Sequence, residues 1–197
     1  MSDASSKRVC VYCASSNSCE AIHHQTASRL GRLLAEGGYT VVYGGGGSGS
    51  MGAMANGVLA ASGQVVGVLP RFMSDLEWGH GGLSELHLVE DMRVRKHMML
   101  QGSDAVVALP GGCGTLEELF EAITLKRLGL YYGAIVLVNT QGFFDPLVAQ
   151  LGRCIQERFM GEKHAEMWTV VDSADDVIHA IESSPEWAKD ARNFAVL

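Results

Sequence analysis

Glycines and two carboxylates stand together at residues 110–118, in the order Pro-Gly-Gly-Cys-Gly-Thr-Leu-Glu-Glu. The segment follows an apolar run and opens a helical pattern, so its backbone N–H groups could bind an anion at the positive end of a helix. Glu118 falls nearly opposite the apolar stripe of that helix and could face a cleft, where it could take part in catalysis. Thr115-x-x-Glu118 also has the form of a capping box, so a purely structural role stays open.

A second glycine-rich segment, Gly-Gly-Gly-Gly-Ser-Gly-Ser-Met-Gly at 44–52, occupies a similar position after an apolar run. Its last six residues match Gly-x-Gly-x-x-Gly, in which glycines let the backbone approach a phosphate. A tight strand–helix turn would use glycine too, and the Lys-Ser/Thr of a Walker A loop is absent. Two such loops favour a shared anion site, to which Gly46 and Gly47 would contribute. Ser15, at the end of the first apolar run, could reach the same ligand or form a turn.

Three cations follow Asp91 in the first turns of a predicted helix: Arg93, Arg95 and Lys96. The helix dipole disfavours positive charge at that end. The cluster is also unexpected because the chain as a whole carries a net charge of −7. An anionic ligand such as a phosphate would balance these cations, and so would neighbouring carboxylates.

The elements that must position these residues alternate along the chain. Continuous apolar runs predict buried strands at 8–15, 39–44, 64–70, 104–110 and 133–140, with weaker candidates at 86–89 and 168–171. The predicted helices lie at about 22–36, 50–62, 92–102, 114–128, 145–159 and 174–183. This order predicts an α/β fold, a Rossmann-like doubly wound and mostly parallel sheet with helices on both faces. Ligands bind beyond the carboxyl ends of such strands, and the irregular stretch 71–85 could fold over a site.

Composition limits the function classes. A chain of 197 residues that is 47% hydrophobic fits one globular domain over residues 1–197. An acidic balance argues against binding to nucleic acid or to an anionic membrane, and no apolar run approaches the ~20 residues of a membrane span. Five cysteines and no signal segment predict a cytoplasmic protein. The histidines lack metal-ligand spacing, and Cys10-x-x-Cys13 lies in a predicted strand, so we expect core cysteines there.

The motif Pro-Gly-Gly-x-Gly-Thr-x-x-Glu at 110–118, together with Met-x-x-Arg-Lys at 92–96, resembles the LOG (“lonely guy”) family. The similarity extends over about residues 8–182. Members of this family are cytokinin riboside 5′-monophosphate phosphoribohydrolases, often mislabelled as lysine decarboxylases. The resemblance implies hydrolysis of the N-glycosidic bond of an N6-substituted adenosine 5′-monophosphate, with release of the free base and ribose 5-phosphate. It also implies a homodimer, and it implies neither a metal nor an organic cofactor.

The resemblance assigns roles to individual residues. Arg95 and Glu118 would be the catalytic pair, with the carboxylate stabilising a ribosyl cation and Arg95 holding the ribose or the phosphate. The residues expected to hold the 5′-phosphate are Lys96, Gly111, Gly112, Gly114 and Thr115. Further substrate contacts are expected at Glu77, Glu117 and Thr124, with Glu77 nearer the base.

Two departures from the family pattern bear on specificity. Cys113 replaces an aromatic residue of the glycine motif, and Leu125 stands where a tryptophan is usual. The substrate could therefore be N6-prenylated AMP or plain AMP, as in an AMP nucleosidase. A nucleotide-binding module without turnover stays open, as does an NADP-linked oxidoreductase based on 47–52 and Arg71. A decarboxylase is not expected, because no lysine lies in a loop suited to pyridoxal phosphate.

Overall fold

The computed structural model describes residues 7–76 and 78–187, in which seven strands form one sheet of order β4-β3-β2-β1-β5-β6-β7. Every neighbouring pair is parallel. The strands are β1 (Arg8–Tyr12), β2 (Thr40–Tyr43), β3 (Gln64–Pro70), β4 (Glu85–Val89), β5 (Ala105–Ala108), β6 (Ala134–Val138) and β7 (Thr169–Val171). All seven predicted strands are present, and the predicted fold class is confirmed.

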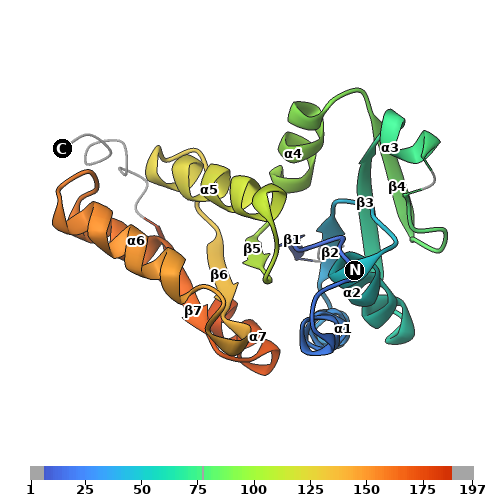
Figure 1. Ribbon diagram of the computed structural model, residues 1–197, viewed down its shortest axis with the longest axis horizontal. Coiled ribbons are helices and arrows are strands. Elements are labelled where there is room, and N and C mark those ends of the chain that lie inside the picture. Colours follow the sequence, from blue (N-terminus) through green and yellow to red (C-terminus); the bar gives the residue numbers. More distant parts are fainter. Residues whose placement is uncertain (1–6, 77, 188–197) are drawn as a thin grey trace, which may run out of the picture.

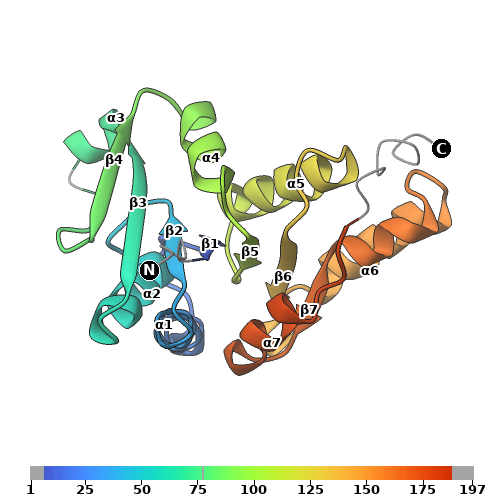
Figure 2. The same cartoon turned by 180° about the vertical axis from the view of Figure 1, so that it is seen from behind.

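Helices cover both faces of the sheet. The helices are α1 (Ala21–Glu36), α2 (Gly49–Ala60), α3 (Arg71–Asp75), α4 (Met92–Leu100), α5 (Cys113–Arg127), α6 (Asp145–Gln156) and α7 (Val177–Glu182). Short 3₁₀ turns lie at Thr140–Gly142, Glu162–Met167 and Ala174–Asp176. Figures 1 and 2 show α1, α2 and α7 on one face and α4, α5 and α6 on the other, which agrees with the two separate apolar cores.

Both faces of the central strand β1 are buried, so its sequence is a continuous apolar run. Val9 and Val11 pack into the core beneath α1 and α2, whereas Cys10 and Tyr12 pack into the core beneath α4 and α5. A strand buried on both faces has no polar side, so its sequence does not alternate. Cys10 is a fully buried core thiol, as predicted for the Cys-x-x-Cys segment.

The stretch 71–85 is more regular than predicted. It contains the five-residue helix α3, and Gly79 forms an isolated antiparallel bridge with Gly46 before β4 begins at Glu85. A helix of little more than one turn gives no periodic signal in a sequence, which explains why α3 was not predicted.

The order in which strands are added to the sheet changes direction between β1 and β5. Strands β2, β3 and β4 extend the sheet on one side of β1, and the chain then returns to add β5, β6 and β7 on the other side. Loops that leave β1 and β5 therefore diverge and open a crevice at the carboxyl edge, the usual ligand position in such folds. Of the helices in the described part of the chain, none has both the length and the apolar character to cross a membrane.

Candidate active site

A cleft of about 560 Å³ opens at this carboxyl edge, between the loop after β1, the glycine loop after β2, and the first turns of α4 and α5. Seven of the residues predicted from the sequence line it: Ser15, Gly46, Arg95, Gly112, Gly114, Thr115 and Glu118. The structure thus brings together predicted residues from four different segments of the chain. Glu77 lies outside the described residues.

Arg95 and Glu118 form a buried ion pair in the floor of the cleft. Each residue is only 5% exposed, and Nη1 of Arg95 donates to Oε1 of Glu118 at 3.1 Å. Arg95 also donates from Nε to the carbonyl oxygen of Val68 and from Nη2 to that of Gly44, both at 3.1 Å. The two carbonyl oxygens fix the orientation of the guanidinium, and the guanidinium in turn holds the carboxylate of Glu118 in place.

Burial raises the pKa of Glu118 to about 7, because a buried carboxylate loses its hydration. The positive charge of Arg95 acts in the opposite direction, and Glu117 adds to the rise. A carboxyl group in a cleft with a pKa near neutrality can change its protonation state under ordinary conditions, which is typical of catalytic groups.

The capping-box interpretation of Thr115 and Glu118 is wrong. Helix α5 begins at Cys113 with Gly112 as its N-cap, so Thr115 lies inside the first turn and makes no capping bond. The side chain of Glu118 is buried beside Leu119, while Phe120 of the predicted apolar stripe is 41% exposed. The helix therefore turns its carboxylate toward the cleft and the sheet, and part of its apolar side outward.

The start of α5 provides the open amides of the cleft. The first N–H groups of a helix have no partner within it, and among the described residues no acceptor is found for those of Gly112, Cys113 and Gly114. Gly111 lies behind this turn, outside the cleft, where an added Cβ would be 2.2 Å from Oγ1 of Thr115. An anion can bind to these amides with support from the helix dipole.

The glycine loop before α2 uses several of its amides within the protein. Gly47 donates to the carbonyl of Trp78 at 3.0 Å, and Gly49 donates to Oδ1 of Asn17 at 2.8 Å. Met51 donates to the carbonyl of Ala14. The loop is therefore mainly a tight strand–helix turn, and Gly47 is not among the residues that line the cleft.

Neighbouring carboxylates balance the cations at the start of α4. Asp91 caps the helix by accepting from the amides of Arg93 and Val94, at 2.8 and 2.9 Å. Nζ of Lys96 pairs with Glu117 and also lies 2.8 Å from Oε2 of Glu121. The hydrogen bond to Glu117, followed by that to Glu121, raises the pKa of Lys96.

The predicted residues Lys96, Glu117 and Thr124 lie outside the cleft. Glu117 and Thr124 line a shallow hollow of about 590 Å³ on the outer face of α5, together with Phe120. Substrate bound in the cleft of the same protomer is therefore not in contact with this face.

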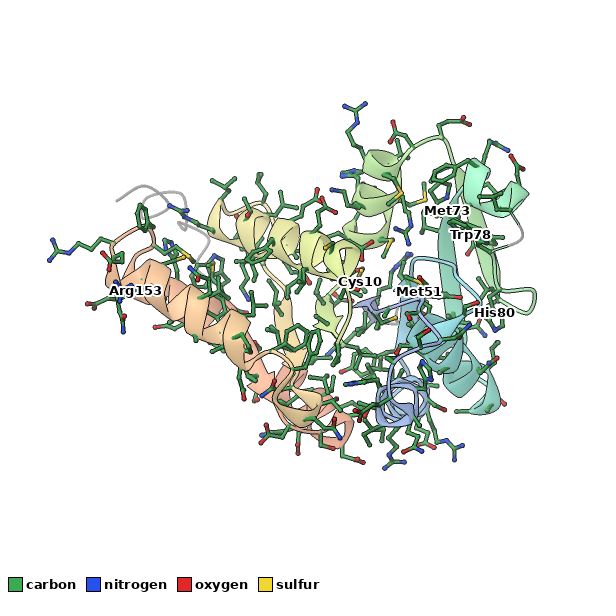
Figure 3. All side chains as sticks on the ribbon, in the orientation of Figure 1. Cys10, Met51, Met73, Trp78, His80 and Arg153 are labelled. Carbon is green, nitrogen blue, oxygen red and sulfur yellow. The ribbon has the colours of Figure 1, made fainter. Side chains whose placement is uncertain are left out.

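The cleft also has an apolar wall, which the motifs in the sequence did not indicate. Met51, Met73 and Met92 line the cleft together with Leu69 and Trp78. Figure 3 shows Met73 and Trp78 together at the α3 side of the molecule, with Met51 on the helix that follows the glycine loop. The cleft thus combines open amides, a buried ion pair and an apolar wall. Within the described ranges, no group of histidine, cysteine and acidic side chains is arranged to hold a metal ion.

Comparisons with known proteins agree with this geometry. A family profile described as “Possible lysine decarboxylase” matches residues 51–181. A probable cytokinin riboside 5′-monophosphate phosphoribohydrolase of Oryza sativa subsp. japonica is 38% identical over 176 residues, covering 89% of this chain and 72% of the relative. The cytokinin riboside 5′-monophosphate phosphoribohydrolase of Rhodococcoides fascians is 38% identical over 178 residues, covering 90% of each chain.

A solved structure shows the same fold. The X-ray structure of a structural genomics target superimposes with a TM-score of 0.71 at 27% identity, covering 89% of this chain and 98% of the other. The similarity to the Rhodococcoides fascians protein extends over nine-tenths of the chain. The chain belongs to the LOG family of cytokinin riboside 5′-monophosphate phosphoribohydrolases.

Proposed function

We propose that this protein hydrolyses the N-glycosidic bond of adenosine 5′-monophosphate or its N6-substituted forms. The observation that carries this proposal is the buried Arg95–Glu118 pair beside the open amides of α5 in one cleft. The relatives named phosphoribohydrolases support it. The products would be a free adenine-type base and ribose 5-phosphate.

The 5′-phosphate binds at the start of α5 in this proposal. The amides of Gly112 and Gly114 donate to its oxygens, and the hydroxyl of Thr115 lies in the same part of the cleft. The partial positive charge of the helix end favours a doubly charged phosphate. This contact fixes one end of the nucleotide and places the ribose near Glu118.

Glu118 acts on the ribose in its ionised form. Cleavage between C1′ and the base passes through an oxocarbenium-like ribosyl cation, which a nearby carboxylate stabilises. The same carboxylate orients the water that adds to C1′ and accepts the proton that this water loses. The bond from C1′ to the base breaks, and the base takes up a proton from solvent. Arg95 keeps Glu118 in place and contributes positive charge toward the phosphate side of the ribose.

The base occupies the apolar part of the cleft, beside Met51, Met73 and Trp78. Methionine side chains are flexible and polarisable, so they adapt to a hydrocarbon group on the base. An isoprenoid group in such a pocket contributes about 1–3 kcal/mol to discrimination. We therefore propose that N6-prenylated AMP is preferred over AMP by roughly tenfold or more in kcat/KM.

We further propose a homodimer that pairs the outer faces of α5. Phe120 is exposed there beside Leu116, and a second copy would bury both. Glu117 and Thr124 lie on the same face, so in a dimer they could meet substrate in the partner's cleft. This arrangement would explain why two expected contact residues lie outside the cleft of their own protomer.

The cytoplasm is the location we propose. All five cysteines are free thiols, two of them fully buried at Cys10 and Cys13. Free thiols persist in a reducing compartment, where small nucleotides are also available as substrates.

A pyridoxal phosphate-dependent decarboxylase does not fit the cleft. Such an enzyme holds its cofactor through a lysine, and the cleft-lining residues in the described part of the chain include no lysine. Lys96 lies nearby but is paired with Glu117 and Glu121. The description of the matching family profile is therefore not the activity we propose.

The test is a chromatographic assay of base release. Purified protein is incubated with AMP or with N6-isopentenyl-AMP, and the free base is measured against time. We expect release from both substrates, faster from the prenylated one. Release from neither substrate would contradict the proposed hydrolysis.

A further inference from the structure

Residues 78–82 begin with Trp78, which lines the cleft, and are joined to the glycine loop by backbone hydrogen bonds. The amide of Gly47 donates to the carbonyl of Trp78, and the amide of His80 donates to the carbonyl of Gly45, each at 3.0 Å. These bonds fix the main chain on either side of Gly79. Neither of these bonds connects the segment to α2, the helix that follows the glycine loop.

The ring of His80 supplies that connection. Nδ1 of His80 lies 3.0 Å from the amide nitrogen of Gly82, and Nε2 lies 3.0 Å from Oδ1 of Asn56. A backbone N–H can only donate, so Nδ1 accepts. In the neutral ring the proton is then on Nε2, which donates to Asn56. One nitrogen closes the turn of the segment itself, and the other ties the segment to α2.

The tie to α2 connects two walls of the same cleft. Asn56 lies on α2, the helix that begins directly after the glycine loop. Trp78 stands on the tied segment, lines the cleft and is 55% exposed. In Figure 3, Met73, Trp78 and His80 lie on the same side of the molecule. His80 itself is not among the cleft-lining residues, so it acts on the cleft through its neighbours.

We propose that His80 is a positioning residue, which ties residues 78–82 to Asn56 and so holds Trp78 where the nucleotide base packs against its ring. The inference rests on the proposed function, because it takes a purine nucleotide as the ligand. A half-exposed indole offers a flat apolar face, and stacking of a base on an aromatic side chain is favourable and tolerant of substituents. Loss of the His80–Asn56 bond is therefore expected to weaken binding of the base, whereas the chemistry at Glu118 does not depend on this bond.

Two variants separate this tie from the local turn. His80→Asn keeps an oxygen that can accept the Gly82 amide two residues on, but its side chain is too short to reach Asn56. Asn56→Ala removes the same tie from the other side. The matched control is His87→Ala, because His87 pairs with Glu85 on the edge strand β4, outside the cleft.

Steady-state kinetics with N6-isopentenyl-AMP give the first readout. We expect His80→Asn and Asn56→Ala each to raise KM by about 3- to 10-fold, the size expected for one lost hydrogen bond, and to change kcat less than 2-fold. The double variant should be no worse than the single ones, and His87→Ala should match the wild type. Wild-type KM in both tie variants would overturn the proposal, as would a fall in kcat that parallels a lower melting temperature.

Binding of AMP, followed by intrinsic fluorescence, gives the second readout. We expect AMP to quench the wild type, Trp78→Phe to lose most of this signal, and the two tie variants to need more AMP for half-maximal quenching. Quenching unaffected by Trp78→Phe would overturn the role of Trp78. If AMP binds but no base is released, the proposed function fails, and the affinities of the tie variants still decide the role of His80.

Discussion

At the residue scale, the guanidinium of Arg95 links the carbonyls of Gly44 and Val68 to the carboxylate of Glu118. These acceptors lie on three different segments, so the orientation of Arg95 is fixed before a substrate binds. Glu118 consequently has a defined position, and its burial raises its pKa to about 7. A change of pH near neutrality therefore changes the protonation state of Glu118.

The first prediction concerns the pH dependence of hydrolysis. Because the proposed mechanism uses the carboxylate form of Glu118, kcat/KM should rise about tenfold per pH unit below the pKa of Glu118 and level off above about 7. Initial rates at low substrate concentration from pH 5.5 to 8.5 measure this. A profile that is flat between pH 6 and 8 would contradict the role of Glu118.

Lys126 gives a second prediction at this scale, for stability. Its side chain is almost fully buried, with Nζ donating to the carbonyl of Gly133 at 2.8 Å, and burial lowers its pKa to about 8. The unfolded chain binds more protons than the native one between about pH 8 and the ordinary value of 10.5, so this group stabilises the native state increasingly as pH rises.

Lys126→Met removes this contribution. Between pH 7 and pH 9.5, the free energy of unfolding of the wild type should gain about 2 kcal/mol relative to the variant. Urea denaturation of both proteins at the two pH values measures the difference, in which the titration of other groups cancels. An unchanged difference would show that Lys126 is not a charged group in a buried site.

At the scale of elements, two helix starts of similar sequence differ in what they offer a ligand. The amides of Gly47 and Gly49 before α2 are bound to other parts of the protein, whereas those of Gly112 and Gly114 at α5 face the cleft. Both segments are rich in glycine for steric reasons, but the amides of Gly47 and Gly49 are already bound within the protein. Glycine content alone therefore does not identify the phosphate site.

Gly44, directly after β2, lies so close to the side chain of Arg95 on α4 that no Cβ fits at this position. A Cβ at this position would lie 1.9 Å from Nη2 of Arg95. Gly44→Ala should displace the guanidinium and lower kcat by roughly 100-fold, as expected when catalytic groups shift by about 1 Å. Gly152→Ala is the matched control, because nothing lies within 4 Å of a Cβ there. Kinetics and circular dichroism of both variants test this, and wild-type activity in Gly44→Ala would contradict it.

At the scale of the whole molecule, the strand order places the cleft between β1 and β5, where the chain changes direction across the sheet. The strands and a ligand site beyond their carboxyl ends were predicted from the sequence, because buried parallel strands carry continuous apolar runs that are easy to detect. The strand order was not predicted and comes from the structure. The resemblance to the LOG family also indicated Arg95 and Glu118, which are 23 residues apart in the chain, as a catalytic pair.

Other features depended on tertiary contacts that a sequence does not display. The start of α5 was misjudged because Gly112, and not Thr115, occupies the N-cap. Methionines at 51 and 73 have the same local pattern whether they fill a core or line a cleft. The outward position of Glu117 follows from the rotation of α5 about its axis, which packing against the sheet determines.

The proposed dimer gives a prediction at this scale. Phe120→Glu places a charge in the centre of the outer face of α5 and should convert the dimer to a monomer with at least tenfold lower kcat/KM. Phe159→Glu is the control, since Phe159 is 73% exposed and lies outside the hollow on α5. Light scattering coupled to size-exclusion chromatography measures the mass. A monomeric wild type would contradict the dimer.

The most direct test of the whole account compares base release and nucleotide binding in the wild type and Glu118→Gln. Glutamine keeps an oxygen that can accept from Arg95, so the ion pair is lost while the fold is retained. We predict that the wild type releases base from N6-isopentenyl-AMP, and that Glu118→Gln binds it within about threefold of the wild-type affinity but releases base at least 1,000-fold more slowly. Undiminished release by Glu118→Gln would contradict the central claim that this buried carboxylate carries the reaction.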